Sequence, residues 1–248
     1  MFETTSLGPI SEITFEDDTV TLPYNATDPL VMDGVKVVIL GSWWEPDYEF
    51  WEDLGIELDD KKSEIGFELD NRYRNVVAFD ANGTLKWIIP EAPHDPPETD
   101  LEPYYKSLWQ TDGDLWVRNK NQRAYRVTPD TGDLLEDVPA NHLRLGGTTI
   151  EFDNGWVGKV LHHDDVVAVM LEGANHPAPS GNNIYVFDQD GTKRWWIGDR
   201  LRDDAPAAGP PFTGMWIDDG DLCGYATDGY TYRFDLYNGD LLDQEWTK

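Results

Sequence analysis

The 248-residue chain contains a single cysteine, Cys223, so it cannot form an intramolecular disulfide. A lone thiol is typical of a reducing compartment or of a lineage that avoids disulfides. The first 18 residues have neither a basic start nor an apolar run, and no segment approaches the roughly 20 apolar residues of a membrane span. These absences predict an intracellular, cytoplasmic protein.

Basic residues are scarce as well. The 48 Asp and Glu residues outnumber the 19 Lys and Arg residues, which gives a formal net charge of −29. Such a charge repels itself unless salt screens it or cations gather at the surface. An acidic surface poor in lysine is typical of proteins from halophiles, so we interpret the charge as an adaptation to salt. Nucleic acid and anionic membranes are poor partners for this chain, because both would be repelled.

Helical periodicity is hard to find in the chain. Short runs rich in Val, Ile, Tyr, Phe and Trp recur instead between clusters of Gly, Asp and Asn, which is typical of strands and turns. Eleven Trp and eleven Tyr residues supply large packing units. The composition therefore predicts one all-β domain spanning residues 1–248.

Two distant stretches of the chain are nearly the same. NVVAFDANGTLKWII at 75–89 matches NIYVFDQDGTKRWWI at 183–197 with an offset of 108 (183 − 75), and the stretch from Ser107 matches that from Gly214 with an offset of 107 (214 − 107). The repeat halves are about 11–140 and 146–248. Because the offset upstream is larger, the first half must carry an insertion, which we place at residues 42–69.

A second, weaker repeat lies within each half. Four segments read VVAFDANGTLKWI, YRVTPDTGDLLED, IYVFDQDGTKRWWI and YRFDLYNGDLLDQ, each a strand, a glycine turn and another strand. Their spacing of roughly 50 to 60 residues is that of propeller blades, each of which needs neighbours to bury its two faces. The sequence thus predicts a four-bladed β-propeller built from a duplicated two-blade unit.

The blade segments resemble a known repeat. Residues 185–188 and 232–235 fit a Tyr-X-X-Asp stretch, and Trp87 and Trp195 fit the tryptophan that ends the following strand. In these residues the chain is similar to the quinoprotein-type repeats of the PQQ-like β-propeller superfamily, and to small haloarchaeal repeat proteins. The resemblance implies a propeller scaffold, of which many members hold no cofactor.

The chain departs from that family at several points. Val77 and Thr128 interrupt the Tyr-X-X-Asp pattern in the first half. Quinone-dependent alcohol dehydrogenases of the superfamily have eight blades and a vicinal cysteine pair against the cofactor, which four blades and Cys223 alone do not provide. We therefore expect no cofactor, and the resemblance implies the repeat rather than the enzyme.

Two turns suggest calcium at first sight. The turns DANG at 80–83 and DQDG at 188–191 carry alternating oxygen side chains followed by glycine, like the first half of a calcium loop. The calcium candidates are Asp80, Asn82, Asp188 and Asp190. The glycine comes too early for an EF-hand, and the six residues after it read as a strand about 20 Å long, too extended to wrap one ion. A tight hairpin demands the same residues and is the favoured interpretation.

The histidines do not form a metal motif. His162 and His163 are followed by Asp164 and Asp165 in LHHDDVV, but neighbouring side chains of a strand point in opposite directions. The other histidines have no motif spacing: His94, His142 and His176. The sequence predicts a solvated turn here and no metal.

Catalytic signatures are missing too. The chain has no Gly-X-Ser-X-Gly, Cys-His pair, phosphate loop or dinucleotide fingerprint, and 48 carboxylates make any single pair uninformative. A pair of carboxylates at the central mouth of the propeller stays open as an alternative, because their separation depends on the tertiary structure.

The most distinctive stretch without a counterpart in the second half is GSWWEPDYEFWEDLGIELDD at 41–60. Its aromatic residues are Trp43, Trp44, Tyr48, Phe50 and Trp51. An aromatic loop on a propeller face can dock a partner, since Trp and Tyr anchor interfaces. It can equally be a lid whose aromatic side chains pack on the propeller. Both interpretations stay open.

The sequence as a whole favours a non-catalytic binding or scaffold module with a protein partner, on its own or within a larger assembly such as a viral particle. The alternative is a hydrolase or lyase on a propeller scaffold. The oligomeric state is not determined by the sequence.

Overall fold

The computed structural model describes residues 10–15, 19–27, 29–32, 34–40, 75–90, 93, 105–173, 183–199 and 211–247. Over these residues every regular element is a β-strand except one short 3-10 turn, η1 (Ile197–Asp199). The prediction of an all-β chain is confirmed. No helix within this part of the chain has the length and apolarity needed to cross a membrane.

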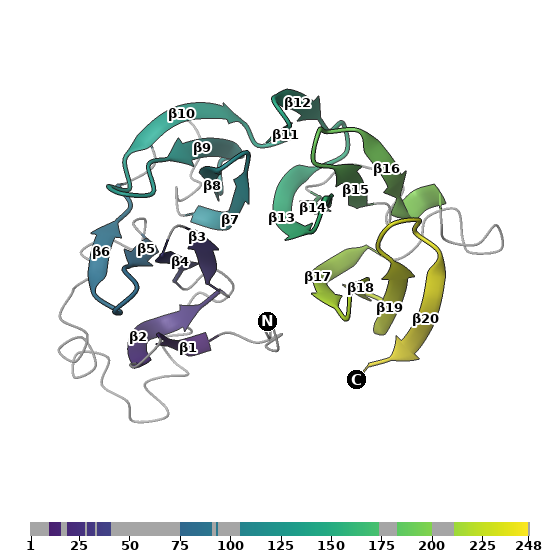
Figure 1. The fold of residues 1–248 in the computed structure, drawn as a ribbon, viewed down its shortest axis with the longest axis horizontal. Coiled ribbons are helices and arrows are strands. Elements are labelled where there is room, and N and C mark those ends of the chain that lie inside the picture. The colour runs from purple at the N-terminus through teal and green to yellow at the C-terminus, as the bar shows by residue number, and fades with distance from the viewer. Residues whose placement is uncertain are drawn as a thin grey trace. The chain divides into compact units, whose positions relative to one another are not determined.

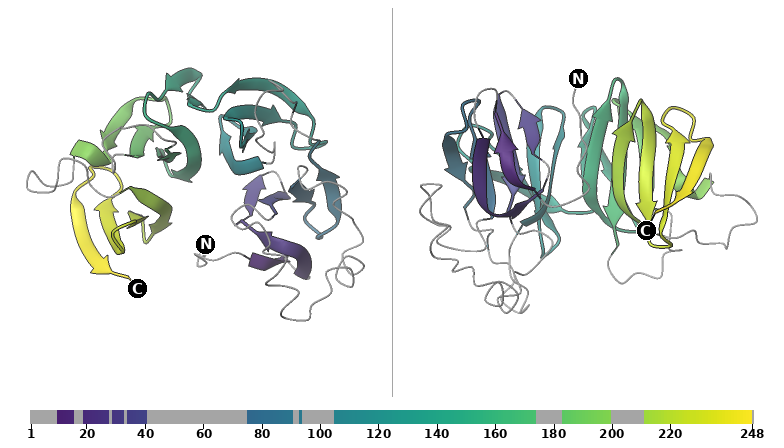
Figure 2. Two further views of the ribbon diagram at one scale, coloured as in Figure 1. Left: turned by 180° about the vertical axis from the view of Figure 1, so that it is seen from behind. Right: turned by 90° about the horizontal axis from the view of Figure 1, so that it is seen from below.

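Four four-stranded sheets follow one another along the described chain, and in each sheet successive strands are neighbours. Figure 1 labels the strands, and the right-hand view of Figure 2 shows them side by side within each sheet. These meanders are the blades of the predicted four-bladed β-propeller arrangement. Their strands are β3 (Leu30–Met32), β4 (Val35–Ile39), β5 (Val76–Phe79), β6 (Leu85–Ile88); β7 (Tyr105–Thr111), β8 (Asp114–Asn119), β9 (Arg123–Val127), β10 (Leu134–Pro139); β13 (Trp156–His163), β14 (Val166–Glu172), β15 (Ile184–Asp188), β16 (Lys193–Trp196); and β17 (Phe212–Asp218), β18 (Asp221–Ala226), β19 (Tyr230–Asp235), β20 (Leu241–Trp246).

Two two-stranded hairpins complete the described elements. They pair β1 (Ile10–Thr14) with β2 (Thr19–Ala26), and β11 (His142–Leu145) with β12 (Thr148–Glu151). Each hairpin precedes two four-stranded sheets, so the order of elements occurs twice along the chain. The chain also divides into two compact units, one of Met1–Leu108 with Asp114–Val138 and one of Trp109–Gly113 with Pro139–Lys248.

In the first unit, the sheet β3–β6 is buried on both faces. Val76 and Ala78 of β5 belong to the core shared with the sheet β7–β10, whereas Val77 and Phe79 belong to a core that includes Phe15, which directly follows β1. Successive side chains of a strand point to opposite faces, so a strand between two layers must be apolar throughout. This explains the uninterrupted apolar run VVAF.

The second unit uses the same construction. The sheets β13–β16 and β17–β20 share a core that includes Trp195, Phe212 and Phe234. On the other face of β15, the ring of Phe187 meets that of Phe152 at 6.2 Å between centroids. The corresponding contact in the first unit joins Phe15 and Phe79 at 6.0 Å.

A tryptophan joins the two blades of each unit. Trp87 donates its indole N–H to the carbonyl of Pro129 at 2.7 Å, and Trp195 donates to the carbonyl of Leu236 at 3.0 Å. The two tryptophans are 108 residues apart (195 − 87) and the two acceptors 107 (236 − 129). The offsets are those of the sequence repeat, so the tryptophan that ends the blade motif also fixes the next blade.

A buried asparagine forms a second link. The Asn75 amide donates to the carbonyls of Leu40 and Tyr105 and accepts from the Tyr105 N–H, at 3.1, 2.9 and 3.0 Å. Asn183 does the same with Leu171 and Phe212, at 2.9, 2.8 and 3.1 Å. A buried backbone group without a partner is costly, so each asparagine satisfies groups that its sheets leave unpaired.

We expect Asn75→Ala to lower the free energy of unfolding by at least about 2 kcal/mol, because three backbone groups in a buried position lose their partner. Urea denaturation followed by tryptophan fluorescence measures the change. The exposed Asn82→Ala is the control, expected to change stability by under about 0.5 kcal/mol. Equal stability of the two variants would contradict the structural role given to Asn75.

Candidate functional site

The aromatic loop proposed from the sequence lies outside the described residues. This holds for Trp43, Trp44, Tyr48, Phe50 and Trp51 and for the whole insertion at 42–69. Whether these aromatic side chains dock a partner or pack on the propeller stays a prediction. The site is therefore built from the turns and strands that the structure describes.

The first calcium candidates, Asp80 and Asn82, lie in the turn between β5 and β6. The Asp80 carboxylate oxygen Oδ1 accepts hydrogen bonds from the backbone amides of Asn82 and Thr84, both at 2.9 Å. The turn is closed by the amide of Gly83, which donates to the carbonyl of Asp80 at 3.1 Å. With a φ of +81°, Gly83 occupies a conformation that favours glycine. The Asp80 carboxylate therefore stabilises the turn by accepting its backbone amides.

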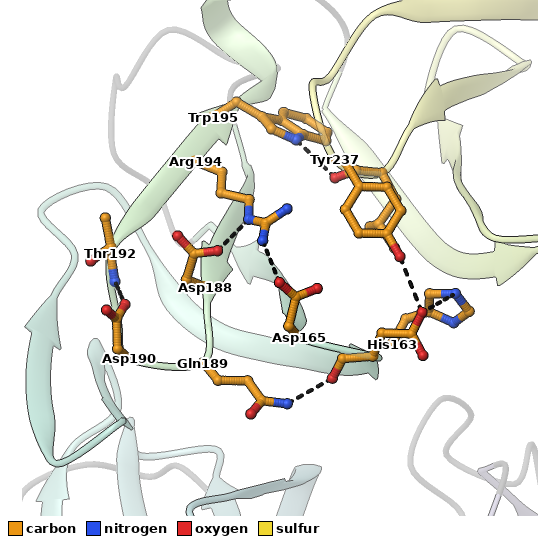
Figure 3. Close-up of polar contacts among 11 residues, drawn as sticks. His163, Asp165, Asp188, Gln189, Asp190, Thr192, Arg194, Trp195 and Tyr237 are labelled. Carbon is orange, nitrogen blue, oxygen red and sulfur yellow. Dashed lines mark hydrogen bonds and ion pairs between the residues drawn. The ribbon is translucent and has the colours of Figure 1, made fainter.

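The second pair, Asp188 and Asp190, lies between β15 and β16 (Figure 3). Asp190 accepts a hydrogen bond from the amide of Thr192 at 2.8 Å, which lowers the pKa of its carboxyl group. Asp188 accepts one from Nε of Arg194, whose guanidinium also donates to Asp165 at 2.7 Å. Arg194 already provides the positive charge at this turn.

The hydrogen bonds of these carboxylates are the ones that stabilise a hairpin turn, so both turns are explained without a bound ion. A calcium ion at either turn would have to displace backbone amides or a guanidinium from the carboxylate oxygens. Within the described ranges, no three His, Cys, Asp or Glu side chains converge in a way that could hold a metal ion.

The two adjacent histidines diverge, as the strand pattern predicts. His162 contacts the carbonyl of Gln110 through its ring Nε2 at 2.6 Å, whereas the Nε2 of His163 lies 3.8 Å from a carboxylate oxygen of Asp164. Asp164 has a φ of +50° and forms the turn between β13 and β14 with Asp165. The pair therefore cannot share one ligand.

Three turns of the second unit meet in one polar network (Figure 3). Tyr237, in the turn between β19 and β20, donates its hydroxyl to Asp164 at 3.1 Å. Its ring lies 5.5 Å from the guanidinium carbon of Arg194, a cation–π arrangement. The Gln189 amide donates to the backbone carbonyl of Asp164 at 2.6 Å. Local desolvation, with the hydrogen bond to Asp164 as a further cause, raises the pKa of the Tyr237 hydroxyl, although the side chain is 43% exposed.

This network is better suited to holding turns together than to catalysis. The guanidinium of Arg194 has carboxylate partners in Asp165 and Asp188. A general acid at neutral pH needs a raised pKa, whereas that of Asp190 is lowered by its hydrogen bond to the Thr192 amide. The charged groups of this network are therefore paired with one another, as Arg194 is with Asp165 and Asp188.

One further ion pair occurs in both units, which also indicates a structural role. Arg126 meets Asp114 at 3.4 Å, and Arg233 meets Asp221 at 2.7 Å. Both members of the pair are shifted by 107 residues (233 − 126 and 221 − 114). Such half-exposed pairs contribute little individually to stability.

Exposed apolar side chains gather in one segment. Of the five large hydrophobic residues that are exposed in the described chain, three lie between residues 237 and 246: Tyr237, Leu242 and Trp246. The other two are Val31 and Leu135. Trp109 and Trp195 are buried and Trp196 and Trp216 are half-buried, whereas Trp246 is exposed. The position of Trp246 at the end of the last strand of a blade is the sequence feature that could have predicted its exposure.

The single cysteine is buried in β18. Burial raises the pKa of the Cys223 thiol to about 11, although the charge of Arg233 acts in the opposite direction. The reactive species is the thiolate, so a raised pKa together with a side chain only 4 % exposed should make the thiol inert.

We expect Cys223 to react with Ellman's reagent at pH 8 far more slowly in the folded protein than in urea. The raised folded pKa also has a stability consequence: the unfolded chain loses the thiol proton first, so stability should fall as the pH rises from about 9 to about 11. The melting temperature of the wild type, compared with Cys223→Ser over this range, isolates the contribution of the thiol. Fast labelling of the folded protein would contradict its buried placement.

Comparison with known proteins identifies a family and a distant structural likeness. A family model described as "Domain of unknown function (DUF7957)" matches residues 64–138 and again residues 135–246. The two matches follow the two halves of the repeat. Comparison with curated proteins gives no match.

Three similar solved structures are each 12% identical to this chain. BamB from Moraxella catarrhalis is 12% identical, with a TM-score of 0.47, and the match covers 92% of this chain and 63% of that one. The computationally designed Ika8 protein is 12% identical with a TM-score of 0.42, covering 90% and 50%. The designed Ika4 protein is 12% identical with a TM-score of 0.36, covering 95% and 96%. The chain thus spans half the length of the Ika8 chain, and these likenesses carry no argument about function.

Proposed function

We propose that this chain, which belongs to the DUF7957 family, is a non-catalytic binding or scaffold module of a halophilic organism that acts through contact with another protein. It would serve alone or as part of a larger assembly such as a viral particle. The observation that carries the proposal is the exposure of Tyr237, Leu242 and Trp246 in one segment of a strongly acidic chain. Exposed aromatic side chains, tryptophan above all, are enriched at protein–protein contacts.

The aromatic loop would contribute a second contact. Trp43, Trp44, Tyr48, Phe50 and Trp51 are the candidate anchors, set among acidic residues in the insertion at 42–69. The alternative of a hydrolase or lyase with carboxylates at the central mouth gains no support from the described carboxylates, since Asp165, Asp188, Asp218 and Asp221 have arginine partners.

The acidic charge implies dependence on salt. We expect the melting temperature to rise when KCl is increased from about 0.2 to about 2 M, because salt screens the repulsion among acidic side chains. Sucrose at matched osmolality is the control, since it favours compact states without screening charge. A melting temperature that rises equally with sucrose, or not at all with KCl, would argue against adaptation to salt.

Affinity capture from a native high-salt lysate tests the binding function. We expect one specific protein to be captured by the intact chain, and to be lost either when residues 42–69 are removed or with the double variant Leu242→Ser, Trp246→Ser. Leu135→Ser is the matched control, because Leu135 is exposed on the equivalent outer strand of the first unit. Capture of the same proteins by every variant would contradict a specific docking surface.

A further inference from the structure

We propose that the outer edge of β20 accepts an extended basic peptide segment of a partner protein, which adds to the sheet as a fifth strand. The proposal rests on the proposed binding function and gives it a second surface, distinct from the aromatic loop. Three observations carry it: the direction of the backbone groups of β20, its difference from β10, and the charge of its exposed side chains.

The backbone of β20 has one unpaired edge among the described strands. β20 is the last strand in its sheet and pairs with β19, so that Tyr232 faces Gln244 and Tyr230 faces Trp246. The amide of Thr247 donates to the carbonyl of Gly229 at 2.9 Å. Because hydrogen-bonded and non-hydrogen-bonded pairs alternate along an antiparallel ladder, the amides and carbonyls of Gln244 and Trp246 point away from β19. The backbone amide of Gln244 donates to the Asp243 carboxylate at 2.8 Å, so an added strand would replace this contact with a main-chain hydrogen bond.

The equivalent edge in the first unit lacks one backbone donor. Trp246 corresponds to Pro139 at the end of β10 (246 − 139 = 107). Proline has no N–H, and at an outward-facing edge position it prevents another strand from pairing. The two copies of the blade therefore differ where an added strand would bind: the edge of β10 lacks the donor and the edge of β20 keeps it.

The side chains of β20 provide an apolar contact on the face of Tyr230 and Tyr232. Trp246 packs edge-to-face on Tyr230 at 4.9 Å, and Gln244 contacts the hydroxyl of Tyr232 at 3.4 Å. Trp246 nevertheless keeps 56% of its surface accessible. Leu242 is exposed as well, but a shift in the register between β19 and β20 falls at this residue, so it does not continue the alternation of Gln244 and Trp246. An added strand would place an apolar residue beside the ring of Trp246.

The other face of β20 is acidic. Asp243 and Glu245 are exposed there, and the arginine opposite Asp243, Arg233, is engaged by Asp218 and Asp221. An added strand would thus meet the negative charge of Asp243 and Glu245 on this face and the ring of Trp246 on the other, which favours a segment that alternates apolar and basic residues. Pairing with a second copy of β20 is disfavoured, because it would bring acidic side chains together.

The test compares two peptides by fluorescence anisotropy in the salt that keeps the protein folded. One alternates valine and lysine over ten residues. The other has the same sequence with N-methyl groups on the amides that would face β20, which keeps the charge but removes the donors. We expect the parent peptide to bind and the methylated peptide to bind at least about tenfold more weakly, because strand addition depends on main-chain hydrogen bonds.

Variants of the protein provide the second comparison. Gln244→Pro removes an outward amide from β20 and should reduce binding of the parent peptide to the level of the methylated one. Asp137→Pro is the matched control, since residue 137 is the equivalent position of β10 (244 − 107 = 137), and it should bind as the wild type does. The melting temperature of each variant shows whether it is folded.

Equal binding of the two peptides to the wild type would overturn the proposal, and this result does not depend on how any variant folds. Unchanged binding by a folded Gln244→Pro variant would overturn it as well. If the parent peptide does not bind at all, the proposal is wrong, while capture of a partner that depends on residues 42–69 would still support the binding function.

Discussion

The need of each four-stranded sheet to bury both faces is the constraint on which the rest of this structure depends. Within each unit a sheet lies between a second sheet and a two-stranded hairpin, so β5 and β14 are apolar on both sides. Packing alone would leave backbone groups unpaired between the layers, and Asn75 and Asn183 satisfy them. The indole N–H groups of Trp87 and Trp195 fix the next sheet in the same way. At the same junctions between layers, apolar side chains are therefore buried and the buried polar groups are hydrogen-bonded.

The two copies of the unit preserve these junctions and differ on their surfaces. Lys86 forms an ion pair with Asp130 in the first unit, and the equivalent Arg194 lies against the ring of Tyr237 in the second. A contact between turns is kept while its chemistry changes from charge pairing to cation–π. The outer strands differ more, with Pro139 in β10 and Trp246 in β20. Buried contacts that hold layers together tolerate little change, whereas surface positions are free to acquire a binding role.

The acidic composition is compatible with this architecture because the described charges are used in two ways. Some carboxylates, such as Asp80, close turns by accepting backbone amides, and others, such as Asp188 and Asp221, pair with arginines. The remaining acids on outer strands face solvent. Their repulsion would be offset by salt and, at β20, by a basic partner strand. The proposed salt dependence and the proposed partner chemistry thus have one cause.

The sequence by itself determined the all-β class, the four repeated blades and the duplication, because offsets of 108 and 107 and apolar alternation are local or periodic signals. Only the tertiary structure decided that Arg194 joins Asp165 to Asp188, that His162 and His163 diverge into separate contacts, and that Trp246 stays exposed on an unpaired edge. These features depend on which turns and edges meet in space, and with 48 carboxylates the sequence offers far more pairs than the fold brings together.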